Sequence, residues 1–460
     1  MASVFADLLA IYKTWPALSS FLKSEEGGRL RVDDYSTAEN PYALIRYVKG
    51  RSDLSKPHAR AFRSVVWDTL EHRPVSVTPF KSADGESVPA EGTPAEYTIE
   101  TFHDGVLIGM WWDKYNQRWR IHTRSTLNAN CRYYSQTTSF AEMFWGAISV
   151  IQQAALNPNK CYSWILQHPE NRIVCPVKAP TLRLIQELEI APSTLTWSPR
   201  TSDLLTRFSN WNDVYARVAD WNARFGHAIQ GIHITGPNGQ RWKVRTAAYN
   251  TIRLTRGNTP RRDYVWLSAW RDRRLNQYLT VFPEERAGAN RIVDAWKRTT
   301  SEVYNYYVDV FKARTLDRKA IPMKLRPLVF GIHGKYLEEL KPQNKTVDWN
   351  VAMEYMNNRD VPQMLFVINY ETRYASQGLG TIPLEPSATV GSEVTGDVDV
   401  RPPPVTIPGP NEEAKCGCEQ VEACACDGCT TCAFVARGLP VPESREERLT
   451  TLEAAATDAV

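Results

Sequence analysis

The chain lacks the segments that would carry it into a membrane or out of a cell. It has no run of about 18 apolar residues, the length that a helix needs to cross a bilayer. Its first residues, MASVFADLLAIYKTW, have neither the basic start nor the small-residue cleavage pattern of a signal peptide. We therefore expect a protein with no membrane span that is kept in a reducing compartment such as the cytoplasm.

Common catalytic signatures are missing as well. The sequence contains no P-loop, no GxGxxG and no Ser-His-Asp order. His233-Ile234-Thr235 is similar to half of an H-x-T phosphoesterase pair, but its only comparable partner, His122-Thr123, has the wrong spacing. We interpret both segments as parts of strands.

What the chain does have is enough apolar sequence for a large folded body. Its 460 residues are 43% hydrophobic and 23% charged, so one large core or two ordinary ones can form. From Ala375 onward, five Lys or Arg and fourteen Asp or Glu give a charge of −9, whereas the preceding body carries +13. A basic body rich in Trp and Tyr suits a polyanion, and a solvated surface of mixed charge is the alternative.

Three regions follow one another along the chain. Residues 1–259 alternate β-like runs with turns, which is typical of antiparallel sheets; the predicted strands include residues 96–102, 105–113 and 171–177, with a helix over residues 139–156. Residues 260–374 have helical spacing and predict a separate helical domain. Residues 375–460 are rich in Pro, Gly and acid and predict a disordered tail. The expected fold class is therefore α+β.

Six segments of the first region share their order and spacing with a known family. They are ARAFRSVVWD, RPVSVTPFKSADGE, ETFHDGVLIGMW, RWRIHTRST, YSWILQHPENRIV and GQRWKVRTAAY, over roughly residues 40–260. This region resembles the adenylyltransferase domain of the phage T4-type RNA ligase family, and the chain is also similar to ligase-like proteins of large DNA viruses. The resemblance implies two antiparallel sheets around a nucleotide site. There, a lysine attacks ATP, carboxylates hold Mg²⁺ and ribose, and basic residues touch the phosphates.

The catalytic lysine of that family is missing from the matching position. In the family motif K-x-D-G the lysine stands two residues before the aspartate, and the segment FHDG places Phe102 there. Phenylalanine has no nucleophilic group. We therefore expect Asp104 and Gly105 to be kept for the turn that they make, with a simple hairpin turn as the alternative reading.

Two further motif positions lack the carboxylate that the family has there. The family's aromatic-Glu pair before P-x-N-R-I-V is replaced by Trp164-Ile165, which removes the carboxylate that faces the ribose. The motif E-G-x-V begins here with Gln230, so a neutral amide replaces a carboxylate that binds metal.

The basic end of the family's site is better matched. Lys243 and Arg245 occupy the K-x-K positions of the last motif, and Arg124 and Arg172 are further candidates for phosphate binding. Lys243 and Arg245 alternate with Trp242, so both side chains are predicted on one face of a strand. That face is either exposed to solvent or directed at phosphates. Arg172 is alternatively a strand residue in an ion pair.

A displaced lysine is the alternative to a degenerate site. Lys81 precedes Asp-Gly, but the spacing is K-x-x-D-G, and one extra residue on a strand reverses the face of a side chain. Lys114 lies in an apparent hairpin turn and is expected to be exposed.

The tail carries a dense cysteine cluster. Six of the nine cysteines fall within KCGCEQVEACACDGCTTC, with the spacing C-x-C-x5-C-x-C-x2-C-x2-C: Cys416, Cys418, Cys424, Cys426, Cys429 and Cys432. Closely spaced thiolates can converge on a soft metal such as Zn²⁺. Disulfides, or a thiol cluster with no defined state, remain alternatives.

These observations lead to three hypotheses. The first is a catalytically degenerate RNA ligase-like protein that binds nucleotide or RNA. The second is an active ATP-dependent ligase that uses a displaced lysine with ATP and Mg²⁺. The third is a structural component of a viral particle that contacts other viral proteins.

Overall fold

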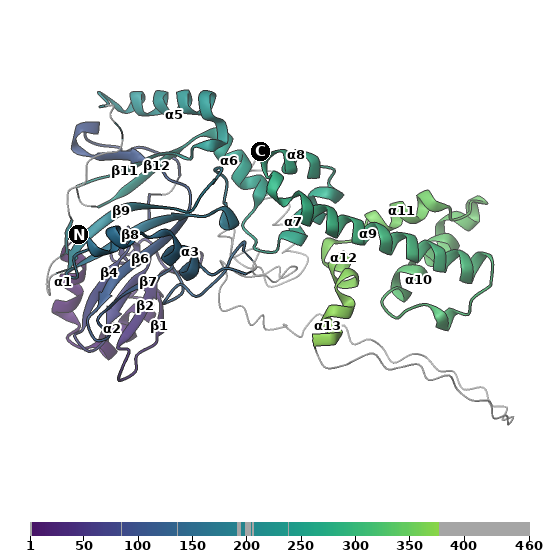
Figure 1. Cartoon of the computed structure of the whole chain (residues 1–460), viewed down its shortest axis with the longest axis horizontal. Helices are drawn as coiled ribbons and strands as arrows, with labels where there is room; N and C mark the ends of the chain where they lie inside the picture. The colour runs from purple at the N-terminus through teal and green to yellow at the C-terminus, as the bar shows by residue number, and fades with distance from the viewer. Residues whose placement is uncertain are drawn as a thin grey trace. The chain divides into compact units, whose positions relative to one another are not determined.

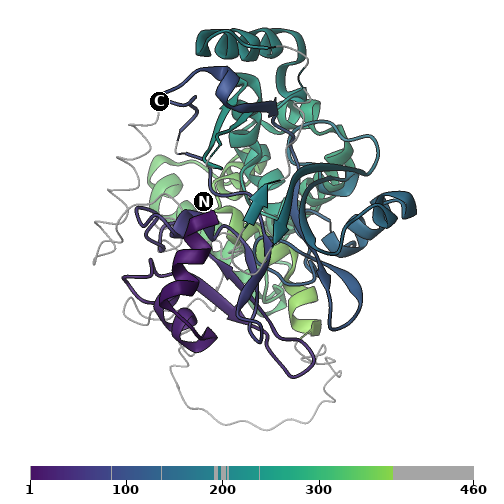
Figure 2. The same ribbon diagram turned by 90° about the vertical axis from the view of Figure 1, so that its left-hand side faces the viewer.

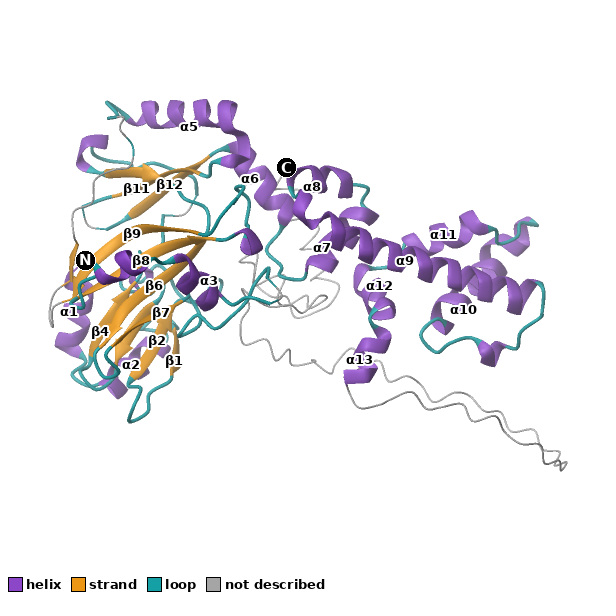
Figure 3. Ribbon diagram, in the orientation of Figure 1, coloured by secondary structure: helices purple, strands orange, loops and turns teal. Residues whose placement is uncertain are grey.

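The computed structural model describes residues 2–376 except residues 84, 136, 191–194, 198–203, 205, 206 and 238. The described chain divides into two compact units, one up to Pro260 and one from Arg261 onward (Figure 1). The first unit is built on antiparallel sheets and the second on helices (Figure 3). The predicted α+β class, with sheets followed by helices, is thereby confirmed. The predicted tail, beyond the end of α13 (Tyr370–Ser376), lies outside the described residues.

The first unit begins with two helices and a four-stranded sheet. The helices are α1 (Ala2–Ile11) and α2 (Trp15–Lys23), and the strands follow in the order β1 (Arg31–Asp34), β2 (Tyr42–Arg46), β3 (Val65–Asp68) and β4 (Arg73–Val77). Both helices lie against the sheet (Figure 2) and bury Phe5 and Leu22 in a core that also contains Trp67.

A five-stranded sheet shares this core. Its strands run in the order β10 (Leu195–Trp197), β9 (Thr181–Ile190), β8 (Lys160–Gln167), β6 (Val106–Asp113) and β7 (Arg118–His122). Trp111 and Cys161 of this sheet join the core of the four-stranded sheet. The opposite face buries Ile108 and Trp164 beneath α3 (Phe140–Ala147), which precedes the short α4 (Val150–Ala154).

A buried histidine fastens these two sheets together. The imidazole of His122 lies 3.0 Å from Ser64 Oγ and 2.8 Å from Ser76 Oγ. Gly109 stands opposite His122 in the β6–β7 ladder, where a Cβ would come within 2.0 Å of Nε2. Burial lowers the pKa of His122 to about 4, so the ring is neutral at pH 7.

The third sheet has three strands, in the order β12 (Arg241–Arg245), β11 (Gly231–Thr235) and β5 (Thr98–Thr101). One of its faces is covered by α5 (Trp211–Phe225), which begins at the N-cap Asn210 and buries Val214 and Val218 against Ile232 and Ile234. Because side chains alternate along a strand, the residues between these apolar positions project from the other face.

The second unit is assembled around one long helix, α9 (Arg286–Tyr307). Apolar residues three or four apart, including Ile292, Trp296 and Val303, bury one stripe of it. The surrounding helices are α7 (Arg262–Arg271), α8 (Leu275–Val281), α10 (Arg326–Lys335), α11 (Trp349–Asn357) and α12 (Val361–Ile368). Both α9 and α10 continue into one turn of π-helix, over Val308–Lys312 and Tyr336–Leu340.

The sequence predictions fail at several points in the first unit. Residues 171–177 form no strand, and the helix predicted over residues 139–156 is two short helices. The ten-residue strand β9 was not predicted, nor were α1, α2 and α5 inside the region that was expected to alternate strands and turns. Among the described residues, no helix is both long and apolar enough to span a membrane.

Candidate functional site

The corner FHDG connects two different sheets. β5 belongs to the three-stranded sheet and β6 to the five-stranded one, so the alternative reading of a hairpin turn is wrong. Asp104 is buried, and its Oδ2 accepts hydrogen bonds from the amides of Val174 and Cys175, each at 2.9 Å. Its Oδ1 accepts a bond of 2.8 Å from the hydroxyl of Tyr249. The carboxylate therefore ties the corner to a loop and to α6 (Ala247–Arg256).

Gly105 occupies a position that excludes a side chain. Its φ is +148°, and a Cβ would come within 2.6 Å of Ile165 Cγ2 and 2.6 Å of the carbonyl oxygen of Leu166. Ile165 is 9% exposed and thus fills the space beside the corner with an apolar side chain.

Phe102 lies in line with a glycine and an arginine across the three-stranded sheet. Its amide donates to the carbonyl of Gly231, and Gly231 pairs with Arg245 on β12. Because Gly231 has no side chain, Arg245 reaches across it, and its guanidinium carbon lies 5.0 Å from the centre of the Phe102 ring. His233 contacts the same ring at 5.6 Å between centres. Phe102 thus forms a cation–π contact at the position that aligns with the lysine of the K-x-D-G motif.

The ladder gathers basic side chains on the face opposite α5. Trp242 and Val244 pack with the core beneath α5, so the alternating residues of β12 project from the other face. We call this surface the basic face; it comprises Arg241, Lys243 and Arg245 of β12 with His233 of β11. The predicted common face of Lys243 and Arg245 is observed.

Further charges surround the basic face. The positive charges of Arg63 and Lys243 act on His233, and that of Lys81 acts on Lys243. Negative charge comes from Glu100, which stands opposite His233 in the β5–β11 ladder. It also comes from Glu86, whose carboxylate lies 2.5 Å from Arg245 Nη1.

Burial and neighbouring positive charges lower the pKa values of the basic groups on this face. Burial lowers the pKa of Lys243, and the charge of Arg245 lowers it further. Burial, followed by the charge of Arg63, lowers the pKa of Arg241. Burial holds the pKa of His233 well below its usual value, so this ring is neutral at pH 7.

His233 and Arg245 each carry a buried nitrogen on this face that has no hydrogen-bond partner in the described chain. His233 is 5% exposed, and the nitrogen concerned is its Nε2 atom. Since buried polar atoms are almost always hydrogen-bonded, this nitrogen marks a place for a polar ligand or water. Surrounding cations favour a ligand that carries negative charge.

The remaining predicted basic residues lie in other surroundings. Arg124 donates to the carbonyl of Tyr47 at 2.8 Å and stacks on its ring at 4.4 Å. Burial lowers the pKa of Arg124 to about 10. Arg172 donates from Nε and Nη2 to the carbonyl of Val174, and it is not a strand residue.

The two candidate substitute lysines differ in position. Lys81 is half-buried near Lys243, and its Nζ lies 3.5 Å from the carbonyl of Ser82. Lys114 lies in the β6–β7 turn, as expected, but it is half-buried rather than exposed, and it pairs with Glu71.

Among the described residues, the donors at the motif positions do not fit a catalytic metal. Gln230 is buried, and its backbone carbonyl accepts from the amide of Thr246. In the described part of the chain, no group of three or more His, Cys, Asp or Glu is arranged to hold a metal ion. The six cysteines from Cys416 to Cys432 lie outside the described residues.

Sequence reasoning missed three members of this region. Arg241 continues the alternation of Lys243 and Arg245 by one step and could have been included from the pattern RWKVR. His233 had been interpreted only as a strand residue, and nothing in the sequence connects Arg63 with β11.

Comparison with known proteins gives distant structural matches only. No protein-family model matches the chain, and no curated protein matches it. Two solved structures are described as forms 1 and 2 of an archaeal ATP-dependent RNA ligase. They are 10% and 11% identical, with TM-scores of 0.36 and 0.37, and the matches cover 80% and 82% of this chain and 82% and 83% of theirs. A third, named as a candidate ATP-dependent DNA ligase from Aquifex aeolicus, is 10% identical with a TM-score of 0.33, over 79% of this chain and 80% of that one. Likeness of this degree assigns neither a family nor an activity.

Proposed function

We propose that this protein is an RNA ligase-like protein without nucleotidyl-transfer activity, which binds the phosphate groups of a nucleotide or of RNA at its basic face. The observation that carries the proposal is the combination of three cations on β12 with the buried, unpartnered Nε2 of His233. A phosphate oxygen would supply both a hydrogen-bond partner for this nitrogen and negative charge for the cations.

The absence of catalysis is proposed from the side chains at the motif positions. Phe102 provides no nucleophile, and Ile165 and Gln230 provide no carboxylate for ribose or metal. The oxygens of Asp104 already accept from two amides and a hydroxyl. A nucleotidyl transfer would need several of these groups at once.

Covalent labelling tests this proposal. The protein is incubated with α-labelled ATP and Mg²⁺ or Mn²⁺ and then separated by denaturing electrophoresis. We expect no labelled band. A band that is lost in Lys81→Ala would overturn the proposal and identify the nucleophile.

Binding to the basic face is tested separately. Fluorescence anisotropy with a labelled single-stranded RNA measures affinity at several salt concentrations. Replacing Arg241 and Lys243 with glutamate should lower the affinity by about tenfold and weaken its salt dependence, because fewer counterions are released. The matched control replaces the exposed Arg118 and Arg224, which lie on β7 and α5, with glutamate. Equal losses in both pairs would show that the basic face is not the binding surface.

A displaced lysine remains the second candidate because the pKa of Lys243 is lowered. Burial lowers the pKa of Lys243, and the charges of Arg245 and then Lys81 lower it further. A lysine with a lowered pKa is a better nucleophile at neutral pH. In the labelling experiment, loss of the band in Lys243→Ala but not in Lys81→Ala would assign the reaction to Lys243.

A further inference from the structure

A second surface with aromatic and basic side chains lies on the helical unit, where α9 ends and α10 begins. Phe311, in the π-helical turn after α9, stacks on His333 of α10 with 3.8 Å between ring centres and 14° between planes. Phe330 of α10 stands edge-on to Phe311 at 6.1 Å. These rings form a continuous group contributed by both helices.

This aromatic group faces solvent in part. Phe330 is 40% exposed, and Phe311 and His333 are half-buried. Other large apolar side chains of the described residues are equally exposed, Phe366 and Trp349 among them, and Phe330 differs from these two in its contact with a ring that an arginine also contacts.

Exposed cations follow Phe311 along the chain, and one of them contacts its ring. Lys312, Arg314, Arg318 and Lys319 are exposed, and none of them forms an ion pair within the described chain. The guanidinium carbon of Arg318 lies 5.4 Å from the centre of the Phe311 ring. The nearby carboxylate of Asp317 accepts from the amide of Lys319 and caps a short 3-10 turn.

The backbone holds this segment in a defined shape. The π-helical turn ends α9, and Arg314 then takes a φ of +59°, which reverses the chain toward α10. Arg326 fastens the returning segment by donating from Nη2 to the carbonyl of Lys319 and from Nε to that of Ile321. The hydrogen bonds of Arg326 therefore hold the segment that carries Lys319 and Arg318, and Arg318 lies over the Phe311 ring.

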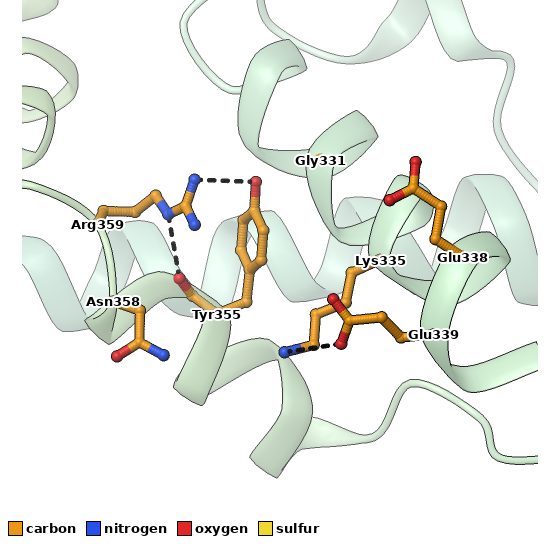
Figure 4. A pocket seen from close by; sticks show the side chains of 7 residues that line it. All are labelled: Gly331, Lys335, Glu338, Glu339, Tyr355, Asn358 and Arg359. Carbon is orange, nitrogen blue, oxygen red and sulfur yellow. Dashed lines mark hydrogen bonds and ion pairs between the residues drawn. The ribbon is translucent and has the colours of Figure 1, made fainter. Parts of the chain in front are cut away.

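A pocket elsewhere in the same unit has a different character. It has a volume of about 250 Å³, and its lining combines Lys335 and Arg359 with Glu338 and Glu339 (Figure 4). Lys335 lies 3.6 Å from Glu339, and Arg359 is stacked on Tyr355 at 4.1 Å. Its charges are balanced, so it has no preference for an anion.

We propose that the aromatic-basic patch, formed by Phe311, Phe330 and His333 with Lys312, Arg318 and Lys319, binds single-stranded RNA. Unpaired bases would stack on the exposed edge of Phe330 and on the Phe311–His333 pair, and the cations would contact the phosphates. Base faces in a duplex are covered by their neighbours, so the patch should prefer single strands. This binding adds a second contact surface to the protein and does not depend on the basic face of the first unit.

The test uses the full chain with a fluorescein-labelled single-stranded RNA, the matching duplex, and an RNA that contains 2-aminopurine. Phe330→Ala should lower affinity for the single strand by about tenfold and reduce quenching of 2-aminopurine, because a stacking surface is removed. The double variant Arg318→Gln and Lys319→Gln should have a shallower slope of log affinity against log salt concentration. The change in slope should correspond to roughly one or two fewer counterions released on binding. Lys297→Gln with Arg298→Gln, about four turns away along α9, is the matched control.

The outcomes separate this proposal from that for the basic face. Each patch variant is also combined with Arg241→Glu and Lys243→Glu in the same chain. A loss of affinity that persists in this background belongs to the patch alone. Unchanged affinity and quenching in Phe330→Ala would overturn the proposal, as would equal losses for single strand and duplex. Loss of binding to anionic phospholipid vesicles, with RNA binding unchanged, would instead assign the patch to a membrane surface. Circular dichroism checks that each variant is folded.

Discussion

Asp104 offers the sharpest distinction between a residue kept for catalysis and one kept for the fold. Replacing a catalytic aspartate in an active site usually leaves stability unchanged or raises it. Here the carboxylate accepts from the amides of Val174 and Cys175 and from the hydroxyl of Tyr249. Its removal would leave three buried donors without an acceptor.

The cost can be worked out from these bonds. A hydrogen bond to a charged acceptor contributes about 1.5–3 kcal/mol, so three of them give roughly 5–9 kcal/mol in sum. Loss of the buried charge removes its own desolvation cost, and we therefore expect Asp104→Ala to lower the free energy of unfolding by about 4 kcal/mol. Asp104→Asn keeps an oxygen for the two amides and an NH₂ group for Tyr249, so its cost should be about 1–2 kcal/mol.

Two measurements check this prediction. Urea unfolding followed by tryptophan fluorescence gives the stability of each variant, and hydrogen exchange reports on the amides of Val174 and Cys175. Both amides should exchange faster in Asp104→Ala. The Tyr249→Phe variant should cost about 1.5–3 kcal/mol in the wild-type background and less in the Asp104→Asn background, because the two groups share one bond. An alanine variant within about 1 kcal/mol of wild type, with unchanged amide exchange, would refute the structural role.

Three further changes test other parts of the first unit. Phe102→Lys should give no covalent label with ATP. In urea unfolding it should destabilise the protein by about 2 kcal/mol, because an ammonium group would replace the ring beneath Arg245. The pKa of His122 is lowered to about 4, below its value in the unfolded chain, so stability should fall by about 3 kcal/mol between pH 7 and pH 4 from this residue. In urea titrations across this range, His122→Gln should remove that part of the slope. Gly231→Ala places a Cβ 2.1 Å from the carbonyl oxygen of Val244, and its melting temperature should fall by several degrees.

The strand pattern in the sequence predicted part of this architecture for a clear physical reason. Alternation of Trp242 and Val244 with basic residues was sufficient to place Lys243 and Arg245 on one face. It could not identify Arg63 as a neighbour of His233, since that proximity depends on how two sheets pack together. The same limit applies to Phe102 and Arg245, whose contact crosses a glycine in the middle strand.

The errors have physical causes as well. Residues 171–177 are rich in β-branched residues but form no strand, because the amides of Val174 and Cys175 donate to Asp104 and not to a neighbouring strand. β9 was overlooked because its sequence, TLRLIQELEI, is rich in Leu, Gln and Glu, which favour helices. Pairing along β8 overrides that preference.

The residues at the positions that resemble the ligase motifs make structural contacts, and this bears on whether substitutions there could introduce activity. Phe102 contacts Arg245, Gly105 packs against Ile165, and Asp104 holds a loop and Tyr249. A lysine at position 102 would lose the cation–π contact and meet the positive charge of Arg245. A glutamate at position 165 would place a carboxylate in an apolar position that is 9% exposed. Each of these substitutions is therefore expected to cost stability before it contributes any chemistry, whereas the phosphate binding proposed for the basic face requires none of these positions.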